Sequence, residues 1–412
     1  MHTRDVDRTI ELCRALLTAR GEVSGARVAS EVLSAYQRLT DDHVTAFFDR
    51  LVKDFSVDPN VVQQTATAYQ HDRSRANLSA LQKAVEPPRQ ELFRRCNMAQ
   101  SGTAILVDMR RRLLRTLPSQ PHHLEIDADL SHLFRSWFNR GFLTLERIDW
   151  QTSAAVLERL IAYEAVHQIQ GWEDLHRRLA ADRRCYGFFH PSLPQEPLIF
   201  IEIALTRAIA AHVQTLLDPD APVDDPARAS CAIFYSITNC QEGLRGIWFG
   251  NVLIKQVVED LGKELASVRI FATLSPIPGF RAWLIERATA ARESISPDLA
   301  ALVMTGDASA AKDVSAKLRD ELMERCARYL ITTESRSGAR DPVARFHLAN
   351  GARLERLNWM GDSSSAGIRQ SFGMTVNYLY RLTDLERNHD AYAHQFRVAS
   401  SKAFQRLASP RR

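Results

Sequence analysis

The chain has 412 residues, of which 45% are hydrophobic and 25% are charged, and its 53 basic and 49 acidic side chains give a formal net charge of +4. This length predicts two or three domains, and the near balance of charge argues against nucleic acid as a partner. No apolar run approaches membrane-spanning length, so we expect no membrane partner. The N-terminal residues lack the apolar core of a signal peptide, and the six cysteines form no C-x-x-C pair. Both features predict a cytoplasmic protein with reduced thiols.

Residues 1–136 predict an all-α domain. Asp41–Leu51 combines two acidic capping residues with an apolar stripe at helical spacing. The longest helix is expected over Glu91–Leu117, with Gly102 as a candidate interruption. We expect its arginine run, Arg110–Arg112, to be a solvated face. A helical domain of this kind stabilises, orients or oligomerises its neighbour.

The polar segment Pro118–Leu130 is predicted to join this domain to the next. It contains His122 and His123 close to several carboxylates, a composition that can indicate a metal site. The spacing does not match the helix-based H-E-x-x-H pattern. We therefore expect a polar linker and no bound metal ion.

From about residue 137 the chain alternates between strands and helices. The expected strands are Pro197–Leu205, Cys231–Ile237, Val268–Leu274, Ala352–Trp359 and Met374–Leu382. Helices are expected over Ala208–Leu217 and from about Gly250 to Ser267. The second of these lies between two strands and predicts a βαβ unit within a mixed sheet.

Ser275 occupies the turn between the strand Val268–Leu274 and a helix that begins near Arg281. Pro276 and Pro278 stiffen this turn because each fixes its own φ. A hydroxyl at such a place faces the crevice beyond the carboxyl ends of strands, near a helix N-terminus that favours negative charge. The structural alternative is a capping serine in a tight turn.

The turn Gln241–Lys255 predicts a phosphate-binding loop. Glycines at 243, 246 and 250 let backbone amides approach a ligand, and the following helix directs its positive end toward it. The run Arg245–Ile254 resembles the R-G-x-G-x-G/A-x-x-L-L loop of the GNAT acetyltransferase superfamily, which grips the pyrophosphate of coenzyme A. Trp248 replaces one glycine of that pattern, and an ordinary β–α turn is the alternative. The absence of G-x-G-x-x-G argues against a nicotinamide enzyme.

The segment Asp341–Gly351 has the start and stop residues of a short helix. Asp341 is suited to the N-cap, Pro342 to the first helical position and Gly351 to the left-handed C-terminal cap. His347 lies on this helix among apolar neighbours. It is a candidate proton donor, and the alternative is a histidine satisfied within the core.

Several sequence blocks, in this order, make the chain similar to the malonyl-CoA decarboxylase family. They are Cys231–Ile237 (CAIFYSI), Leu274–Phe280 (LSPIPGF), Pro342–Ala352 (PVARFHLANGA), Asn358–Met360 (NWM) and Asn377–Tyr380 (NYLY), with weaker matches at Trp137–Arg147, Glu164–His167 and Arg183–Tyr186. The resemblance spans the chain from about residue 137 and, more weakly, the helical half. It implies an α+β protein, with a helical domain at residues 1–136 that builds a homotetramer and a GNAT-like mixed-sheet α/β catalytic domain at residues 137–412.

The resemblance also assigns site residues. It places the family's serine on Ser275, its histidine on His347 and a tyrosine near the site on Tyr380. It places the CoA loop on Arg245, Gly246, Ile247, Trp248, Phe249, Gly250 and Asn251. The chain departs from some relatives at Trp248, where those relatives carry a glutamate.

These assignments predict a decarboxylase of fatty acid metabolism acting on malonyl-CoA. The thioester carbonyl accepts the electron pair released with CO₂, so we expect neither a metal ion nor a cofactor besides the CoA of the substrate. Ser275 would hydrogen-bond the malonyl carboxylate or the thioester oxygen, and His347, with a near-neutral pKa, would protonate the enolate carbon. Tyr380 would support them as a further donor. The alternatives are a CoA-dependent N-acyltransferase and a non-catalytic acyl-CoA-binding scaffold.

Overall fold

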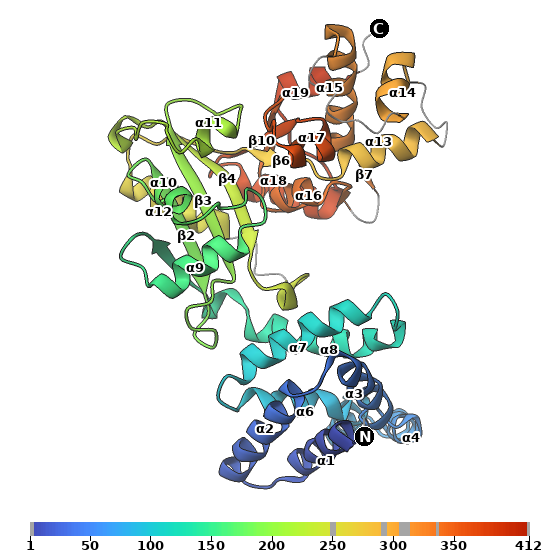
Figure 1. Ribbon diagram of the computed structural model, residues 1–412. Helices are drawn as coiled ribbons and strands as arrows, with labels where there is room; N and C mark the ends of the chain where they lie inside the picture. The colour runs from blue at the N-terminus through green and yellow to red at the C-terminus, as the bar shows by residue number, and fades with distance from the viewer. Residues whose placement is uncertain (1–3, 248–252, 290–294, 305–313, 335–337, 410–412) are drawn as a thin grey trace. The chain divides into compact units, whose positions relative to one another are not determined.

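The computed structural model describes residues 4–247, 253–289, 295–304, 314–334 and 338–409 (Figure 1). The chain divides into two compact units. Unit 1 comprises Met1–Thr144, Phe189–Leu198 and Gln241–Phe249, and unit 2 comprises Leu145–Phe188, Ile199–Cys240 and Gly250–Arg412. The predicted fold class, a helical N-terminal part followed by a mixed sheet with helices, is confirmed. The domain boundary between residues 136 and 137 stays a prediction.

Unit 1 is built from helices. They are α1 (Arg4–Thr18), α2 (Glu22–Gln37), α3 (Asp41–Asp54), α4 (Pro59–His71), α5 (Arg75–Val85), α6 (Pro88–Asn97), α7 (Gly102–Thr116) and α8 (Leu124–Trp137), with short 3₁₀ turns η1 (Pro121–His123), η2 (Arg140–Phe142) and η4 (Glu242–Leu244). Most of them bury one apolar stripe, as amphipathic helices of a bundle do. Helices α4 and α5 lie against each other, and none of their residues is buried.

The single helix predicted over Glu91–Leu117 is two helices, and Gly102 is the reason. A Cβ at Gly102 would lie 2.3 Å from the carbonyl oxygen of Cys96, so only glycine fits where the chain turns back. Ser101 adopts the left-handed conformation, with φ of 58°, immediately before it. The chain therefore leaves α6 and enters α7 through a sharp corner.

The polar segment Pro118–Leu130 is not a linker. It forms the 3₁₀ turn η1 and the first half of α8. The expected joint is thus part of the helical unit. Glu125 and Asp127 lie in the first turn of α8, where their negative charges are stabilised by the positive end of the helix dipole.

Unit 2 contains the mixed sheet. Its strands are β1 (Thr144–Ile148), β2 (Arg183–Phe189), β3 (Ile199–Thr206), β4 (Cys231–Asn239), β5 (Ile270–Thr273), β6 (Ser275–Pro276), β9 (Arg353–Asn358) and β10 (Thr375–Tyr380), and β7 (Thr333–Glu334) pairs separately with β8 (Gly338–Ala339). The strand order among the described residues is β1-β2-β3-β4-β5-β10-β6, with β9 beside β10 (Figure 1). Strands β4 and β5 are parallel and β10 runs antiparallel to β5, so the predicted βαβ unit is confirmed.

Helices accompany the strands along the chain of unit 2. They are α9 (Ala154–Tyr163), α10 (Trp172–Arg178), α11 (Gln214–Leu217), α12 (Leu253–Glu264), α13 (Phe280–Thr289), α14 (Pro297–Met304), α15 (Ala316–Ile331), α16 (Pro342–Ala349), α17 (Ser365–Ser371), α18 (Leu385–Gln395) and α19 (Lys402–Ala408), with the 3₁₀ turn η3 (Pro226–Arg228). Within the described ranges, every helix is too short or too polar to traverse a lipid bilayer.

The helix predicted over Ala208–Leu217 is mostly wrong, since only α11 is helical. The carbonyl oxygens of Ile209 and Ala210 accept hydrogen bonds from the Arg356 guanidinium, at 3.0 and 3.1 Å. The side-chain amide of Asn377 also donates to Ala210 O, at 3.0 Å. Side chains of β9 and β10 therefore take the backbone acceptors that a helix would have used, and tertiary contacts override local propensity.

Candidate active site

Ser275, His347 and Tyr380, which are far apart in the sequence, lie together in unit 2. Ser275 Oγ is 3.1 Å from His347 Nε2, and the Tyr380 hydroxyl is 2.7 Å from His347 Nδ1. The three residues are 5%, 3% and 2% exposed, respectively. The structure thus brings together the three residues that the sequence singled out, in a continuous chain of hydrogen bonds.

The position of Ser275 follows from the pairing of β6 with β10, in which Ser275 lies opposite Val376. Thr273, two residues earlier, accepts a hydrogen bond from Ser275 Oγ at 2.8 Å. Its Oγ1 also accepts from the Tyr378 backbone N–H at 3.1 Å. Sequence reasoning missed Thr273, although strand alternation places residues 273 and 275 on one face and offered a signal.

The N-terminal cap of α16 positions His347. Asp341 Oδ1 accepts hydrogen bonds from the backbone N–H groups of Val343 and Ala344, both at 3.0 Å, which confirms the predicted N-cap. Its Oδ2 accepts from the N–H of Gly279 at 3.1 Å. One carboxylate therefore joins the helix that carries His347 to the turn that follows Ser275.

Replacing Asp341 by alanine is expected to lower the free energy of unfolding by about 2–4 kcal/mol. The variant loses the helix cap of a buried carboxylate, 1% exposed, and removes the acceptor of the half-buried Gly279 N–H. Urea denaturation of both proteins measures the difference. Asp341→Asn keeps one acceptor oxygen for the cap and should lose less. Equal stability of Asp341→Ala and the unchanged protein would contradict the assigned role.

The hydrogen bonds define the protonation state of His347. The Ser275 hydroxyl donates to Thr273, so its oxygen is left to accept from the His347 Nε2–H. The other ring nitrogen, Nδ1, then accepts from the Tyr380 hydroxyl. Burial lowers the pKa of His347 to about 3 and raises the pKa of Tyr380 well above its usual value, so both are neutral. The expectation of a near-neutral pKa for His347 is wrong for the ligand-free site.

A cavity of about 210 Å³ opens onto Ser275 and His347. Its polar lining also includes Asn239, and the apolar walls include Phe234, Val343 and Phe346. Its size suits a small acyl group rather than a nucleotide. Apolar walls keep water away from a bound anion and strengthen the few hydrogen bonds that reach it.

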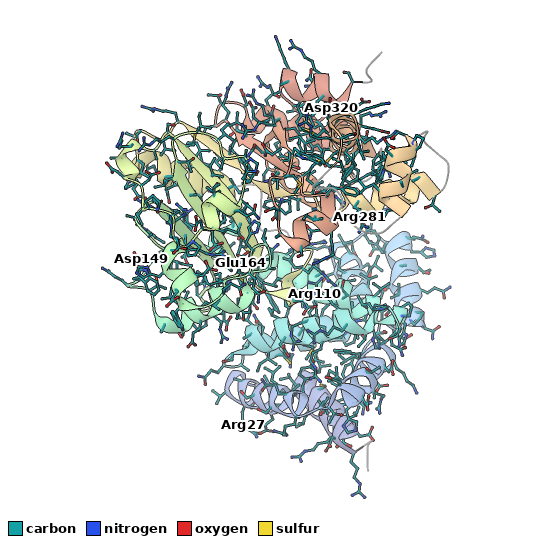
Figure 2. All side chains as sticks on the ribbon, turned by 45° about the horizontal axis from the view of Figure 1, so that its top comes forward. Arg27, Arg110, Asp149, Glu164, Arg281 and Asp320 are labelled. Atoms are coloured by element: carbon teal, nitrogen blue, oxygen red, sulfur yellow. The ribbon has the colours of Figure 1, made fainter. Side chains whose placement is uncertain are left out.

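Glu164, labelled in Figure 2, is a buried residue to which the sequence gave no role. Its carboxylate accepts hydrogen bonds from the hydroxyls of Ser236, at 2.8 Å, and Thr238, at 3.0 Å, both on β4. It also accepts from the backbone N–H groups of Val166 and His167, at 2.8 and 2.7 Å. Glu164 therefore fastens the segment that carries Val166, a wall residue of the cavity, to the strand that forms another wall.

The predicted CoA loop is described only in part. Arg245, Gly246 and Ile247 belong to unit 1, and Gly246 has the positive φ of 78° that favours glycine. Trp248, Phe249, Gly250 and Asn251 lie outside the described residues. A ligand-binding role for this loop stays a prediction.

Arg110 of α7 holds the described part of this loop (Figure 2). Its Nη1 donates to the carbonyl oxygens of Gly243, at 2.7 Å, and Arg245, at 2.9 Å, and its Nε donates to Asp127 at 2.8 Å. Arg110 is 3% exposed, so the prediction that Arg110–Arg112 forms a solvated face is wrong at its first residue. Three acceptors satisfy the buried guanidinium, which the charge run alone did not reveal.

Comparison with known proteins identifies close relatives. Residues 141–412 match the model of the malonyl-CoA decarboxylase C-terminal domain, and residues 55–138 match that of the malonyl-CoA decarboxylase N-terminal domain. The mitochondrial malonyl-CoA decarboxylase of Anser anser anser is 35% identical over 378 residues, which cover 83% of this chain and 75% of that protein. The Rattus norvegicus protein of the same name is 33% identical over 389 residues, covering 86% and 79%.

Solved structures agree with these relatives. The crystal structure of malonyl-CoA decarboxylase from Agrobacterium vitis is 46% identical with a TM-score of 0.91, covering 98% of this chain and 100% of that one. The crystal structure of malonyl-CoA decarboxylase from Rhodopseudomonas palustris is 44% identical with a TM-score of 0.89, covering 97% and 99%.

Proposed function

The chain belongs to the malonyl-CoA decarboxylase family of carboxy-lyases, and we propose that its conversion of malonyl-CoA to acetyl-CoA and CO₂ takes place at Ser275, His347 and Tyr380. One observation carries the proposal. Ser275 Oγ and His347 Nε2 are in hydrogen-bond contact at a cavity sized for an acyl group.

The bond between C2 and the carboxylate carbon breaks when its electron pair enters the thioester carbonyl, which leaves CO₂ and an enolate. This step is fastest when the carboxylate is desolvated and the enolate oxygen is hydrogen-bonded. Ser275 lies in the cavity lining with apolar walls around it, so its hydroxyl is suited to bind either the carboxylate or the thioester oxygen. The thioester is itself the electron sink, and the proposed reaction uses no metal ion and no cofactor besides the CoA of the substrate.

The enolate then takes a proton at C2, and we assign its delivery to His347 Nε2. Burial keeps the ring neutral in the ligand-free site, and a malonyl carboxylate brought beside it favours the imidazolium, because an opposite charge raises the pKa of a histidine. Each turnover consumes one proton, which returns to His347 from solvent. In the ligand-free site the Tyr380 hydroxyl donates to Nδ1 and directs Nε2 toward Ser275. Once the ring is an imidazolium, its Nδ1–H donates to the Tyr380 oxygen instead.

Incubation with malonyl-CoA in the absence of any acyl acceptor tests the function. We expect acetyl-CoA and CO₂ in equal amounts from the unchanged protein and a large loss of both from Ser275→Ala. A CoA-dependent N-acyltransferase would instead need an amine acceptor, and a scaffold would bind the thioester without turnover. Family membership favours decarboxylation over both.

The CoA-binding role of the loop Arg245–Asn251 is part of the proposal, and Arg110 tests it. Replacing Arg110 by methionine removes the donors to Gly243 O and Arg245 O. We expect KM for malonyl-CoA to rise roughly 10-fold, equivalent to about 1.4 kcal/mol, with kcat little changed, since binding rather than chemistry is weakened. The neighbouring Arg111 donates to Asp108 on its own helix, so Arg111→Met is the matched control. Equal KM values in the two variants would contradict this role.

We also propose a homotetramer, built by the helical residues 1–136. Helices α4 and α5 bury none of their own residues, which supports a role for this pair as a contact surface between copies. Mass measurement in solution, before and after deletion of the α4–α5 pair, tests the assignment.

A cytoplasmic location is the last part of the proposal. All six cysteines are buried free thiols, which supports a reducing compartment. Cell fractionation with marker enzymes of each compartment tests it.

A further inference from the structure

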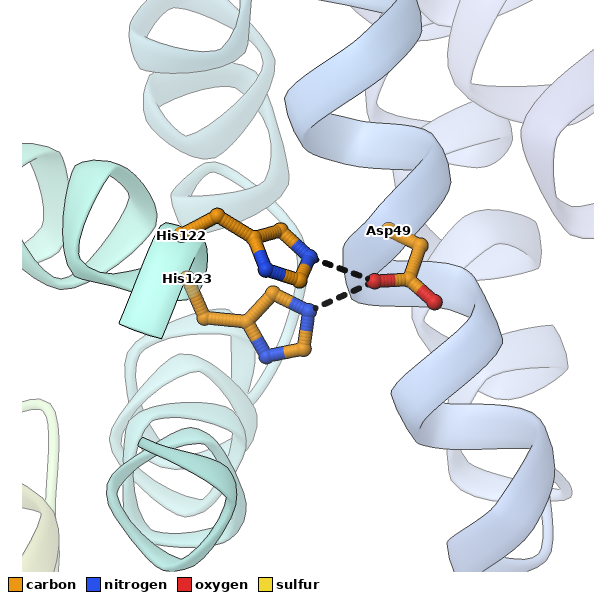
Figure 3. Close-up of side chains that lie close together, drawn as sticks. All are labelled: Asp49, His122 and His123. Atoms are coloured by element: carbon orange, nitrogen blue, oxygen red, sulfur yellow. Dashed lines mark hydrogen bonds and ion pairs between the residues drawn. The ribbon is translucent and has the colours of Figure 1, made fainter. Parts of the chain in front are cut away.

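Three side chains with metal-binding chemistry, none of them assigned to the reaction, converge in unit 1. Asp49 belongs to α3, and His122 and His123 belong to the turn η1 between α7 and α8. Both Nε2 atoms point to one oxygen of Asp49, at 2.7 Å from His122 and 3.0 Å from His123 (Figure 3). One ligand atom from each residue lies within 4.8 Å of the others.

Thr116 holds the far side of the His123 ring. Its hydroxyl lies 2.8 Å from Leu113 O and 2.8 Å from His123 Nδ1. When the hydroxyl donates to the Leu113 carbonyl, its oxygen accepts from the His123 Nδ1–H, and Nε2 is then free to bind a cation.

His123 Nε2 lies opposite a carboxylate oxygen, 3.0 Å from Asp49 Oδ1. Either a shared proton or a metal cation between the two atoms stabilises this contact. The imidazole is fully buried and packs edge-on against Phe48, with ring centroids 5.6 Å apart, so it is fixed in this orientation. His122 Nε2 faces the same Asp49 oxygen, so the three candidate ligand atoms lie next to one another.

We propose that Asp49, His122 and His123 bind one Zn²⁺ ion that ties α3 to the connection between α7 and α8. Two imidazoles and a carboxylate form a common protein ligand set for Zn²⁺, with water as the fourth ligand. Tetrahedral bonds of about 2.0–2.1 Å place ligand atoms about 3.4 Å apart. The present distances of 2.7 and 3.0 Å reach that value with a movement of less than about 1 Å.

The surroundings match those of known zinc ligands. A metal-bound histidine donates its second N–H to a protein acceptor that fixes the ring, and Thr116 supplies that acceptor to His123. Asp49 and His122 are partly exposed, with 48% and 46% of the side chain accessible, which leaves room for water at the open position. Imidazole ligands argue against Mg²⁺ and Ca²⁺, which prefer oxygen.

The test uses the full-length protein, stripped with a chelator and titrated with Zn²⁺ in a calorimeter. We expect saturable binding of one Zn²⁺ per chain and a higher Tm in its presence. X-ray absorption should show only nitrogen and oxygen ligands at about 2.0–2.1 Å. Sulfur ligation would assign the metal to cysteines and overturn the proposal.

Variants locate the ion. His122→Gln and Asp49→Asn alter exposed side chains and should keep the fold, yet weaken Zn²⁺ binding by at least about 100-fold, more than the loss of an outer partner does. Thr116→Val should weaken binding by roughly 10–100-fold. His132→Gln, at an exposed histidine of α8 outside the cluster, is the control and should bind as the unchanged protein does. If only a proton bridges the cluster, neither saturable binding nor a Tm shift will occur, and unchanged affinity in His122→Gln would equally refute the site.

Discussion

Replacement of His347 by alanine is expected to lower kcat for malonyl-CoA decarboxylation by about 10²–10⁴-fold, with a modest change in KM. The imidazole contacts Ser275, its Nε2–H is directed to that hydroxyl, and its imidazolium form is a far stronger acid than a hydroxyl group. Without it the enolate must wait for a proton from water, which the apolar walls restrict.

Acetyl-CoA formation measured by chromatography gives the rate, and CO₂ release confirms it. His394→Ala is the matched control, because His394 is an exposed histidine of α18 in the same unit. Turnover near that of the unchanged protein would remove His347 from the mechanism.

The pH dependence of the free energy of unfolding provides a second test of His347. The pKa of His347 is about 3 in the folded chain, against about 6.5 in the unfolded one, so the unfolded chain binds more protons between these values. The contribution of His347 is therefore fully present above pH 6.5 and is lost as the pH falls toward 3, with a slope of about 1.4 kcal/mol per pH unit. In His347→Gln this part of the slope should disappear, as denaturation between pH 4 and 7 would show.

Replacement of Ser275 by alanine is expected to lower kcat/KM by about 10²–10³-fold, the usual cost of removing one donor to a developing charge. The variant also removes the acceptor of the His347 Nε2–H. Ser363→Ala, at an exposed serine of the same unit, serves as the control, and thermal unfolding of both variants separates misfolding from lost chemistry. Activity within a few-fold of the unchanged protein would contradict the assignment.

Binding measurements with Ser275→Ala identify which oxygen Ser275 contacts. Malonyl-CoA and acetyl-CoA share the thioester carbonyl, and only the first has a carboxylate. If Ser275 binds the carboxylate, the variant loses affinity for malonyl-CoA alone. If it binds the carbonyl, both affinities fall by the same factor.

Local sequence patterns predicted those parts of the site that depend on neighbours along the chain. The cap at Asp341 is written in adjacent residues and is found in the structure. Ser275 was expected on a turn but lies in the short strand β6, because it pairs with β10. The contact between Ser275 and His347 joins residues 72 positions apart, and the family resemblance rather than periodicity pointed to it.

The features that the sequence could not predict depend on contacts between residues far apart in the chain. Arg110 is buried because acceptors from the segment 243–245 surround it, 133 and 135 residues away. The sequence analysis set aside a metal site at His122 and His123 because their neighbours match no ligand spacing, and Asp49 lies more than seventy residues earlier. The low pKa of His347 arises from desolvation, which only the folded chain produces.

The bond from Asp341 to Gly279 means that the two reactive groups of the site share one anchor. Directed evolution toward bulkier acyl groups should therefore spare the residues that hold this anchor. It has freedom instead at Phe234, Val343 and Phe346, whose apolar side chains line the cavity. A library restricted to those codons would change which acyl group binds while leaving Ser275 and His347 in place.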